Sequence, residues 1–408
     1  MIISGRLVFP DQTRAGHIRI DGETIAEVGC DLGQPDVEFN DDCLVFAGMG
    51  DIHIHARDDV SEEQTYKEDF VTAAAAAVQG GVVHVADMPN NPAAPIDDES
   101  YAAKQQHLER RNVPIQITLY AGIGPDTRPL SQPVPYKAYM GPSVGDLFFT
   151  SLEQLENALF HYRGCDVSFH CEDPVLLESH KHEATHEQQR PPACESSATR
   201  FALAMIEKYD LTGKLCHYSV EEGLPLIRAA KQKGLRVTCE VTPHHLFFDE
   251  SEITPTNRGL MQMNPPLRCA GDREAMLDGL RDGTLDYLAT DHAPHTLEEN
   301  AAGISGQPHL DTYGAFVTWL ISEKEFTPQR IAEVCSANPG RFVNPYTAPK
   351  KFGLIEAGYM ASLTVLNMRR PKLVQRADLK TKCGWSPFEG TTFPGSVEAV
   401  YVDGRRLT

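Results

Sequence analysis

Residues 52–57 read Ile-His-Ile-His-Ala-Arg, a short run in which histidines alternate with apolar residues. In a β-strand, side chains two positions apart point to the same side, so His53 and His55 would share one face. Similar short apolar runs recur along the chain and alternate with stretches that have helical patterning. This alternation predicts βα units around a parallel sheet, with residues 52–55 as the first strand.

Counted from residue 50, the chain contains eight candidate strands of this kind. They are residues 52–55, 82–87, 115–121, 134–139, 167–170, 215–219, 237–241 and 287–291. Candidate helices lie between many of them, at residues 67–79, 151–162, 198–208, 221–233 and 272–281. Eight strands favour a closed (β/α)8 TIM barrel over an open doubly wound sheet. The polar stretch 180–192 is predicted to be a loop.

Both ends of the chain have β-rich patterning. Asp21-Gly22 separates two alternating runs, which is a strong hairpin signal. Residues 362–366 and 397–402 predict two further strands near the C-terminus. We therefore expect residues 1–47 and 354–408 to form one composite β-sandwich domain beside a barrel of residues 48–353.

Composition limits the partners that the chain can have. The 408 residues, 41% of them hydrophobic, allow a large core, and the formal net charge of -20 argues against a nucleic-acid surface. The sequence has no secretory signal and no apolar run near the roughly 20 residues that a membrane span needs. The ten cysteines form no CxxC pair, which fits reduced thiols. These features predict a cytoplasmic enzyme with a small-molecule substrate.

Several metal-competent side chains fall at the ends of different predicted strands. The pair His53 and His55 alone is weak evidence, because histidines on strands are often only hydrogen-bonded. His170 ends the fifth strand, His217 lies in the sixth and Asp291 closes the eighth. In a barrel these strands deliver their ends to the same rim, so together the residues predict a metal site there.

Lys137, on the fourth predicted strand, is the unusual member of this group, because an ammonium ion repels metal cations. Desolvation beside cations should lower its pKa, and a neutral amine can react with carbon dioxide to give a carbamate. A carbamate is an anionic bridge suited to two metals. A surface lysine with its charge in solvent is the alternative, but the surrounding histidines favour the bridging role.

The order of several motifs resembles dihydroorotase, a cyclic amide hydrolase of the amidohydrolase superfamily. The motifs are HIHAR at 53–57, MPN at 88–90, Lys137, HCED at 170–173, CEVTPHH at 239–245, MNPPLR at 263–268 and ATDHAPH at 289–295. The match runs from about residue 48 to 296, and weaker similarity continues through residues 382–388. The resemblance implies reversible hydrolysis of (S)-dihydroorotate to N-carbamoyl-L-aspartate in pyrimidine biosynthesis.

The resemblance also implies a role for each matching residue. One zinc ion would be held by His53, His55, Lys137 and Asp291, and a second by Lys137, His170 and His217. Lys137 would be carboxylated, and Asp291 would be the general base. The substrate would be held by Arg57, Asn90, Asn264, His295 and Pro308, with Arg57 and Asn90 facing its carboxylate. The family further implies a homodimer and a possible association with aspartate transcarbamoylase.

Other assignments stay open. A hydantoinase or allantoinase would use much the same metals, although Arg57 and Asn90 favour a substrate with a carboxylate. An inactive partner of a transcarbamoylase would typically lack metal ligands, whereas this chain keeps each position. Cys216 and Glu240 would either bind an extra zinc ion or be a buried thiol and a carboxylate that orients a ligand. The histidines of residues 180–186 and 244–245 fit loop or packing roles.

Overall fold

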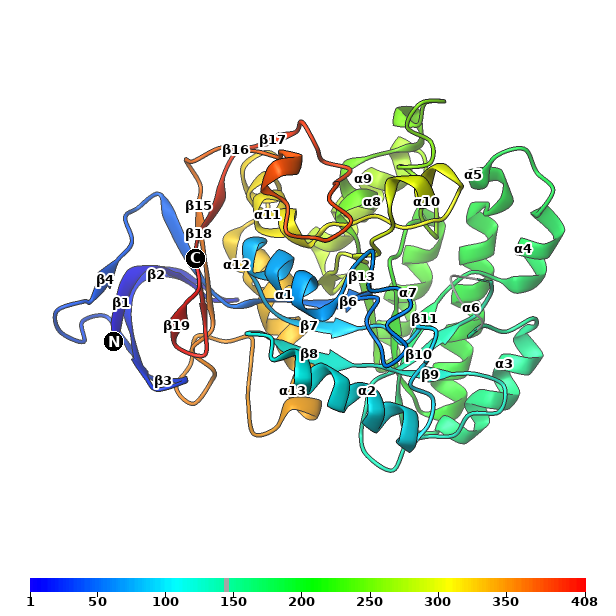
Figure 1. Ribbon diagram of the computed structural model, residues 1–408, viewed down its shortest axis with the longest axis horizontal. Helices are drawn as coiled ribbons and strands as arrows, with labels where there is room; N and C mark the ends of the chain where they lie inside the picture. The colour runs from blue at the N-terminus through cyan, green and yellow to red at the C-terminus, as the bar shows by residue number, and fades with distance from the viewer. Residues whose placement is uncertain (143–146) are drawn as a thin grey trace.

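Parallel strands form a barrel wall in the computed structural model, which describes residues 1–142 and 147–408 (Figure 1). They are β6 (Met49–Ile54), β7 (Val82–Asp87), β8 (Gln116–Leu119) continued by β9 (Ala121–Ile123), β10 (Tyr136–Tyr139), β11 (Asp166–His170), β12 (Thr212–Leu215), β13 (Val237–Val241) and β14 (Tyr287–Leu288). Each pairs in parallel with its neighbour. A parallel bridge between Ile54 and His292 joins the last segment to the first, so the predicted closed barrel is confirmed.

Helices follow most of the strands and cover the outside of the barrel (Figure 1). They include α1 (Phe70–Gln79), α2 (Asp98–Arg111), α3 (Leu152–Leu159), α6 (Pro192–Tyr209), α7 (Leu224–Gln232), α9 (Ala270–Asp282), α11 (Tyr313–Ser322) and α13 (Asn338–Thr347). In α1, Asp69 and Thr72 form a capping box that fixes the start of the helix. Four of the five alanines of α1 are buried, and their small side chains let the helix lie close to the wall.

Three local features differ from the prediction, and one of them is that the eighth strand ends at Leu288 and does not continue to Asp291. Residues 180–192 are not entirely loop, because a short helix, α5 (His186–Gln189), starts where Thr185 caps it. The sixth strand ends at Leu215 and does not continue to residue 219. His217 has a φ of 36°, and its backbone N–H donates to the carboxylate of Glu240 at 3.0 Å. The chain therefore turns after Leu215, and His217 lies on that turn.

The terminal segments form a mixed sheet at one end of the molecule (Figure 1). The strand order is β19 (Arg405–Arg406), β18 (Ser396–Val402), β15 (Leu363–Asn367), β5 (Cys43–Ala47), β1 (Ile2–Val8), β2 (Thr13–Asp21) and β3 (Thr24–Gly29), with β4 (Val37–Glu38) also on β1. β5 pairs with β15, so the two ends of the chain share this sheet. The sheet fits the predicted β-sandwich, while the boundaries at 47 and 354 stay a prediction.

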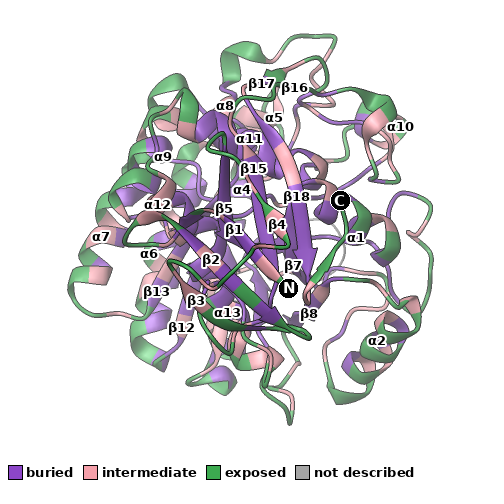
Figure 2. Cartoon of the chain, turned by 90° about the vertical axis from the view of Figure 1, so that its left-hand side faces the viewer, coloured by how far each residue is buried: buried purple, intermediate pink, exposed green. Residues whose placement is uncertain are grey.

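β5 joins this sheet to the barrel, because both of its faces are buried. Cys43, Val45 and Ala47 pack into the core of the terminal sheet, and Leu44 and Phe46 pack into the core of the barrel. Figure 2 looks toward the terminal sheet and shows β5 and β15 as buried. Alternate side chains of one strand therefore hold the two parts together.

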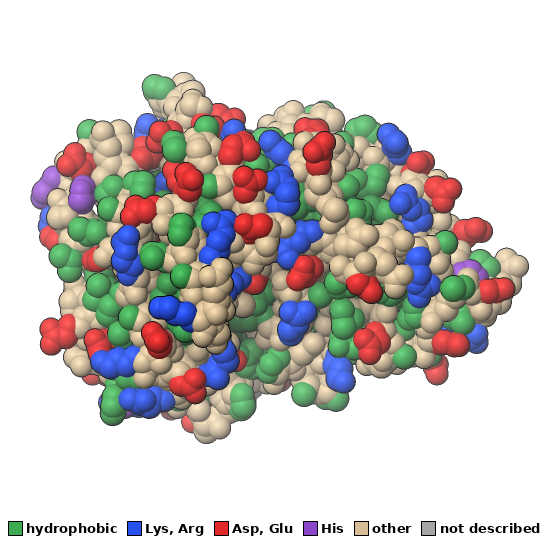
Figure 3. All heavy atoms as spheres, turned by 180° about the vertical axis from the view of Figure 1, so that it is seen from behind, with side chains coloured by type: hydrophobic (Ala, Val, Ile, Leu, Met, Phe, Trp, Pro, Cys, Tyr) green, Lys and Arg blue, Asp and Glu red, His purple; other side chains and the backbone are tan. Residues whose placement is uncertain are grey.

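Among residues 1–142 and 147–408, no helix has the length and apolar character needed to cross a membrane. On the face seen in Figure 3, acidic and basic side chains are interspersed. This distribution gives that face no concentrated basic area of the kind that binds nucleic acid.

The fold predicts a steric limit at Gly50, in the first barrel strand. A Cβ added there would lie 1.9 Å from Cε1 of the buried His84. We expect Gly50→Ala to lower the free energy of unfolding by about 1–3 kcal/mol, because this core has no room for the methyl group. Urea denaturation followed by circular dichroism measures the change. Gly271→Ala in α9 is the control, since its nearest atom is the Cys269 sulfur at 3.6 Å. Equal stability of the two variants would contradict this account of the packing.

Candidate metal centre

A small cavity lies at the carboxyl ends of the barrel strands. Its lining contains all six residues predicted as metal ligands and three of those predicted to hold the substrate. The lining residues are His53, His55, Arg57, Asn90, Lys137, Tyr139, His170, His217, Met263, Asn264, Asp291, Ala293, Ser305 and Gly306. The fold thus brings together side chains that are far apart in the sequence.

Three acceptor atoms meet in this cavity. Nδ1–H of His55 donates to the side-chain carbonyl oxygen of Asn90 at 2.7 Å, which leaves Nε2 without a proton. Nδ1–H of His53 likewise donates to the carboxylate of Glu240. Asp291 Oδ1 lies 3.0 Å from Nε2 of His55 and 3.2 Å from Nε2 of His53. Three lone pairs therefore converge, and a bound cation would relieve their repulsion.

His170 and His217 form a second group of nitrogens beside the first. Nε2–H of His170 donates to the carboxylate of Glu172 at 2.7 Å, so its Nδ1 has no proton. That Nδ1 lies 2.8 Å from Nε2 of His217. Although burial opposes the charge of Glu172, the guanidinium of Arg190 and the bond to His170 lower the pKa of this carboxyl to about 2. An ionised Glu172 thus fixes the tautomer of His170 and presents Nδ1 to the cavity.

Burial keeps these imidazoles in the form that binds metals. It lowers the pKa of His53, His55 and His217 well below the ordinary value, and nearby positive charges lower it further. Neutral imidazole is the metal-binding form of histidine. Ligand atoms of His53, His217 and Asp291 all lie within 4.8 Å of one another. Nitrogen and carboxylate donors at this spacing fit a divalent metal ion.

Lys137 is fully buried beside these ligands. Its Nζ donates to the sulfur of Cys216 at 2.9 Å and lies 5.2 Å from the centre of the Tyr139 ring. In the described part of the chain, no ion pair joins Lys137 to a carboxylate. A buried ammonium group without a carboxylate partner is costly.

Glu240 and Cys216 lie next to the same ligands. Their ligand atoms and one of His53 lie within 4.8 Å of one another. The carboxylate of Glu240 already accepts hydrogen bonds from His53, from the ammonium of Lys214 and from the backbone N–H of His217. These bonds fit a carboxylate that orients His53 and His217. This assignment is simpler than an extra zinc ion bound by Glu240 and Cys216.

The substrate side of the cavity has polar groups without partners. Arg57 is 2% exposed, and its Nε and Nη1 have no hydrogen-bond partner among the described residues. The hydroxyl of Tyr139 and Oδ1 of Asn264 are also buried and unpartnered. Sequence reasoning missed Tyr139, although its position two residues after Lys137 on one strand would have placed it on the same face.

Other predicted residues lie around the cavity and not in its lining. His295 contacts Arg57 through Nε2 at 3.1 Å. Pro308 is buried outside the lining, and Ser305 and Gly306 of the same loop line the cavity. His186 donates from Nε2 to the backbone carbonyl of Met263 at 2.9 Å, next to Asn264. This bond gives His186 a part in holding the loop.

The histidine pair after β13 also supports loops. His244 Nδ1 lies 2.9 Å from Nε2 of His309, and Nε2–H of His245 donates to the carbonyl of Pro265 at 3.1 Å. Pro265 follows Asn264, so His245 fixes the backbone beside a lining residue. Neither histidine lines the cavity itself.

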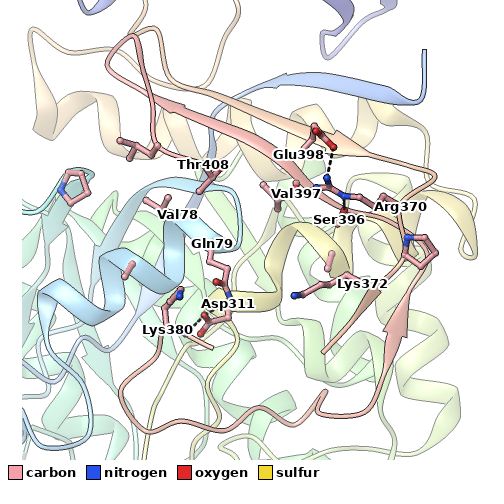
Figure 4. A pocket seen from close by; sticks show the side chains of 15 residues that line it. Val78, Gln79, Asp311, Arg370, Lys372, Lys380, Ser396, Val397, Glu398 and Thr408 are labelled. Carbon is pink, nitrogen blue, oxygen red and sulfur yellow. Dashed lines mark hydrogen bonds and ion pairs between the residues drawn. The ribbon is translucent and has the colours of Figure 1, made fainter. Parts of the chain in front are cut away.

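A larger cavity of about 750 Å³ lies between α1, α11, β18 and the C-terminus (Figure 4). Its charged groups are mostly paired within the protein. Arg370 and Glu398 form an ion pair at 3.1 Å, and the carboxylate of Asp311 accepts the backbone N–H of Lys380 at 2.6 Å. The barrel-end cavity, by contrast, holds buried groups without partners, which marks it as the functional site.

Known proteins resemble the chain over its whole length. The chain matches the Amidohydrolase family over residues 44–407. Dihydroorotase from Pyrococcus furiosus is 30% identical, over 99% of this chain and 91% of that protein. Dihydroorotase from Pediococcus pentosaceus is also 30% identical, over 99% of this chain and 98% of that protein.

Solved structures share the fold. L-hydantoinase (dihydropyrimidinase) from Arthrobacter aurescens has a TM-score of 0.88 at 21% identity, covering 100% of this chain and 95% of that chain. Dihydropyrimidinase from Brevibacillus agri has a TM-score of 0.85 at 21% identity, covering 100% of this chain and 94% of that chain. Both comparisons support the barrel with its terminal β-structure.

The converging lone pairs predict that the protein binds divalent metal through named residues. We expect purified protein to contain divalent metal, and His217→Ala and Asp291→Ala to lose most of it, because each removes a ligand atom from the cavity. Inductively coupled plasma mass spectrometry measures the content. His186→Ala, which contacts only a loop carbonyl, is the control and should keep its metal. Normal metal content in both ligand variants would refute the site.

Proposed function

Since the chain belongs to the amidohydrolase family, we propose that it is a dihydroorotase, a cyclic amide hydrolase that converts (S)-dihydroorotate to N-carbamoyl-L-aspartate. The observation that carries the choice of substrate is the buried guanidinium of Arg57, which has N–H groups without acceptors in the cavity. Dihydroorotate carries a carboxylate on its ring, and this carboxylate is the acceptor that Arg57 lacks.

Arg57 is suited to select an anion. Arginine stays charged, and its planar guanidinium donates several hydrogen bonds to one carboxylate. A buried cation with unpaired N–H groups costs free energy until an anion reaches it. A substrate carboxylate therefore recovers more free energy at this position than a neutral group of the same size.

The other unpartnered groups complement a cyclic amide. Asn264 Oδ1 is an acceptor, which suits a ring N–H, and the Tyr139 hydroxyl is a donor, which suits a ring oxygen. Asn264 follows Met263 in the lining, whereas Tyr139 comes from the end of β10, so the two approach a ligand from different elements. Their chemistry favours a ring that offers both donors and acceptors.

We propose that the metal is zinc, with two ions per chain bridged by a carbamate on Lys137. The buried position of Lys137 without a carboxylate partner supports a modified, anionic side chain there. When bound, the metal ions would polarise the amide carbonyl and make a water molecule acidic enough to attack it. His53 and His55 would hold the first ion with Asp291, and His170 and His217 the second.

Asp291 would move the proton. Its Oδ1 faces the two imidazoles, and its Oδ2 makes no hydrogen bond or ion pair in the described part of the chain. Burial raises the pKa of the Asp291 carboxyl above its ordinary value, which favours uptake of a proton by this group. Oδ2 would take the proton of the attacking water and deliver it to the leaving ring nitrogen.

The alternatives receive less support. The solved hydantoinase and dihydropyrimidinase structures share the fold, but Arg57 favours a ring with a carboxylate over one without. An inactive partner protein is disfavoured because all six ligand candidates line one cavity. A cytoplasmic location fits the ten free cysteines. A homodimer and an association with aspartate transcarbamoylase stay predictions from the family resemblance.

The proposed bridging role of Lys137 predicts that bound metal and activity are lost together when this side chain is removed. Lys137→Ala should lose metal and activity together, because the bridge between the two ions disappears. Adding short carboxylic acids should restore part of the turnover, since a carboxylate can occupy the vacated position. Metal analysis and a spectrophotometric assay of dihydroorotate hydrolysis measure both effects. A variant with normal metal content and a normal rate would exclude the bridge.

The anion-binding role of Arg57 predicts a change in substrate preference. Losing one member of a desolvated charge pair costs on the order of 2–5 kcal/mol, so Arg57→Met should lower kcat/KM for dihydroorotate by roughly thirtyfold or more. Dihydrouracil, the same ring without the carboxylate, should be a poor substrate that is nearly indifferent to the change.

Steady-state assays of dihydroorotate and dihydrouracil with the parent enzyme and with Arg57→Met isolate the contribution of the interaction between Arg57 and the substrate carboxylate. Arg200→Met is the control, because it breaks only an exposed ion pair with Glu222. Metal content should be normal in all three proteins. If the parent enzyme prefers dihydrouracil or hydantoin, or if Arg57→Met loses equally on both rings, a broader cyclic amidase replaces the dihydroorotase assignment.

A further inference from the structure

His295, next to the cavity, lies between two cationic donors. Nη2 of Arg57 is 3.1 Å from Nε2 of His295, and Nζ of Lys67 is 3.2 Å from Nδ1. Guanidinium and ammonium groups donate hydrogen bonds and cannot accept them. A neutral imidazole has one unprotonated nitrogen, so it can accept from only one of the two. The contacts therefore require a particular proton position on His295.

Glu299 resolves this conflict. Its Oε2 lies 3.3 Å from Nδ1 of His295, and its Oε1 accepts from Nζ of Lys67 at 3.0 Å. If the proton of His295 is on Nδ1, it is directed at a carboxylate, and Nε2 is free to accept from Arg57. With the proton on Nε2, two donors would face each other at 3.1 Å. With the proton on Nδ1, Lys67 also faces an N–H at 3.2 Å, but Glu299 can then accept from Lys67 through Oε1 and from His295 through Oε2.

Glu299 is itself held firmly. It is the third residue of α10 (Leu297–Ala301), and its Oε2 accepts the backbone N–H of Thr296 at 2.9 Å in a capping box. The hydroxyl of Tyr66 donates to its Oε1. Although burial opposes the charge, these bonds and the one from Lys67 lower the pKa of Glu299 to about 2, so an ionised acceptor faces His295.

The surroundings of His295 fix the rest of its geometry. Burial, followed by the charges of Arg57 and Lys67, lowers the pKa of His295 far below its ordinary value, so the ring is neutral. The indole N–H of Trp385 donates to the backbone carbonyl of His295 at 2.8 Å. With ring and backbone both held, the tautomer is the remaining variable.

We propose that Glu299 is a specificity-determining positioning residue, which holds the proton of His295 on Nδ1 so that Nε2 anchors Arg57 with its unpaired N–H groups toward the substrate. The inference rests on the proposed function, because the ligand class it selects is a cyclic amide that bears a carboxylate. Glu299 does not touch the substrate. It acts through His295 on the orientation of Arg57.

The kinetic test compares Glu299→Leu with Glu298→Leu. Glu298 is exposed on the same short helix and serves as the matched control. Loss of a charge-assisted hydrogen bond predicts a rise in KM for dihydroorotate of roughly tenfold or more, with kcat changed by less than about threefold. Dihydrouracil should respond less than about twofold. Glu299→Gln keeps one acceptor oxygen and should recover most of the loss.

A second readout does not depend on activity. Long-range ¹H–¹⁵N spectra of labelled protein distinguish the two histidine tautomers, and His295→Gln identifies the resonance. The parent protein should have the proton on Nδ1. Lys67→Met should keep that tautomer, because Glu299 still accepts from Nδ1–H when the ammonium group is absent; a shift of the proton to Nε2 in this variant would overturn the proposal. This variant tests the proposal even if Glu299→Leu fails to fold.

The outcomes separate this inference from the proposed function. If the parent protein does not hydrolyse dihydroorotate, the proposed function fails, while the tautomer measurement still decides the role of Glu299. If the proton is on Nε2 in the parent, the inference is overturned. It is also overturned if Glu299→Leu impairs both substrates equally, since Glu299 would then only stabilise the loop.

Discussion

The convergence of Asp291 Oδ1 with two unprotonated imidazole nitrogens is the constraint on which the rest of the structure depends. These atoms repel one another unless a cation lies among them, so the fold must hold them against that repulsion. His53 lies in the first barrel strand, His55 directly follows it, and Asp291 follows the last strand. The backbone N–H of His55 donates to the carbonyl of His292 at 2.8 Å, which joins these ends of the barrel. Barrel closure therefore brings together the residues of the candidate metal centre.

Each unprotonated nitrogen also depends on an acceptor behind it. Asn90 and Glu240 take the Nδ1 protons of the first pair, and Glu172 takes the Nε2 proton of His170. The carboxylates need cations of their own, and Lys214 and Arg190 supply them. A buried charge whose partner is lost costs several kcal/mol, so the ligands, acceptors and cations form one interdependent set. A similar chain of contacts is proposed on the substrate side, where Glu299 fixes the tautomer of His295 and His295 fixes the orientation of Arg57.

Strand periodicity was sufficient to predict the closed barrel and the terminal β-structure, and to place the six metal-ligand candidates at one rim, whereas Arg57, Asn90 and Asn264 were assigned from the family resemblance. It could not predict that His217 and Asp291 lie on left-handed turns, because a side-chain bond such as the one from His217 N–H to Glu240 is invisible in a hydrophobic pattern. Strand periodicity also could not predict which loop residues contact the cavity. Pro308 was expected at the substrate, whereas Ser305 and Gly306 of that loop line the cavity. Glu299 carries no strand signal and gains its meaning only from its neighbours.

The C-terminal segment has a direct part in the site, although every predicted metal ligand lies between residues 53 and 291. Trp385 holds the backbone of His295, and the carboxylate of Glu68 accepts both the backbone N–H of Lys382 at 3.2 Å and Nε2–H of His292 at 3.2 Å. These bonds fasten the residues that follow Asp291 at two points. Because Asp291 and His295 share this stretch, the segment after the barrel helps to hold both. The terminal part of the chain therefore helps to hold this stretch, directly through Trp385 and indirectly through Glu68, which bonds to both Lys382 and His292.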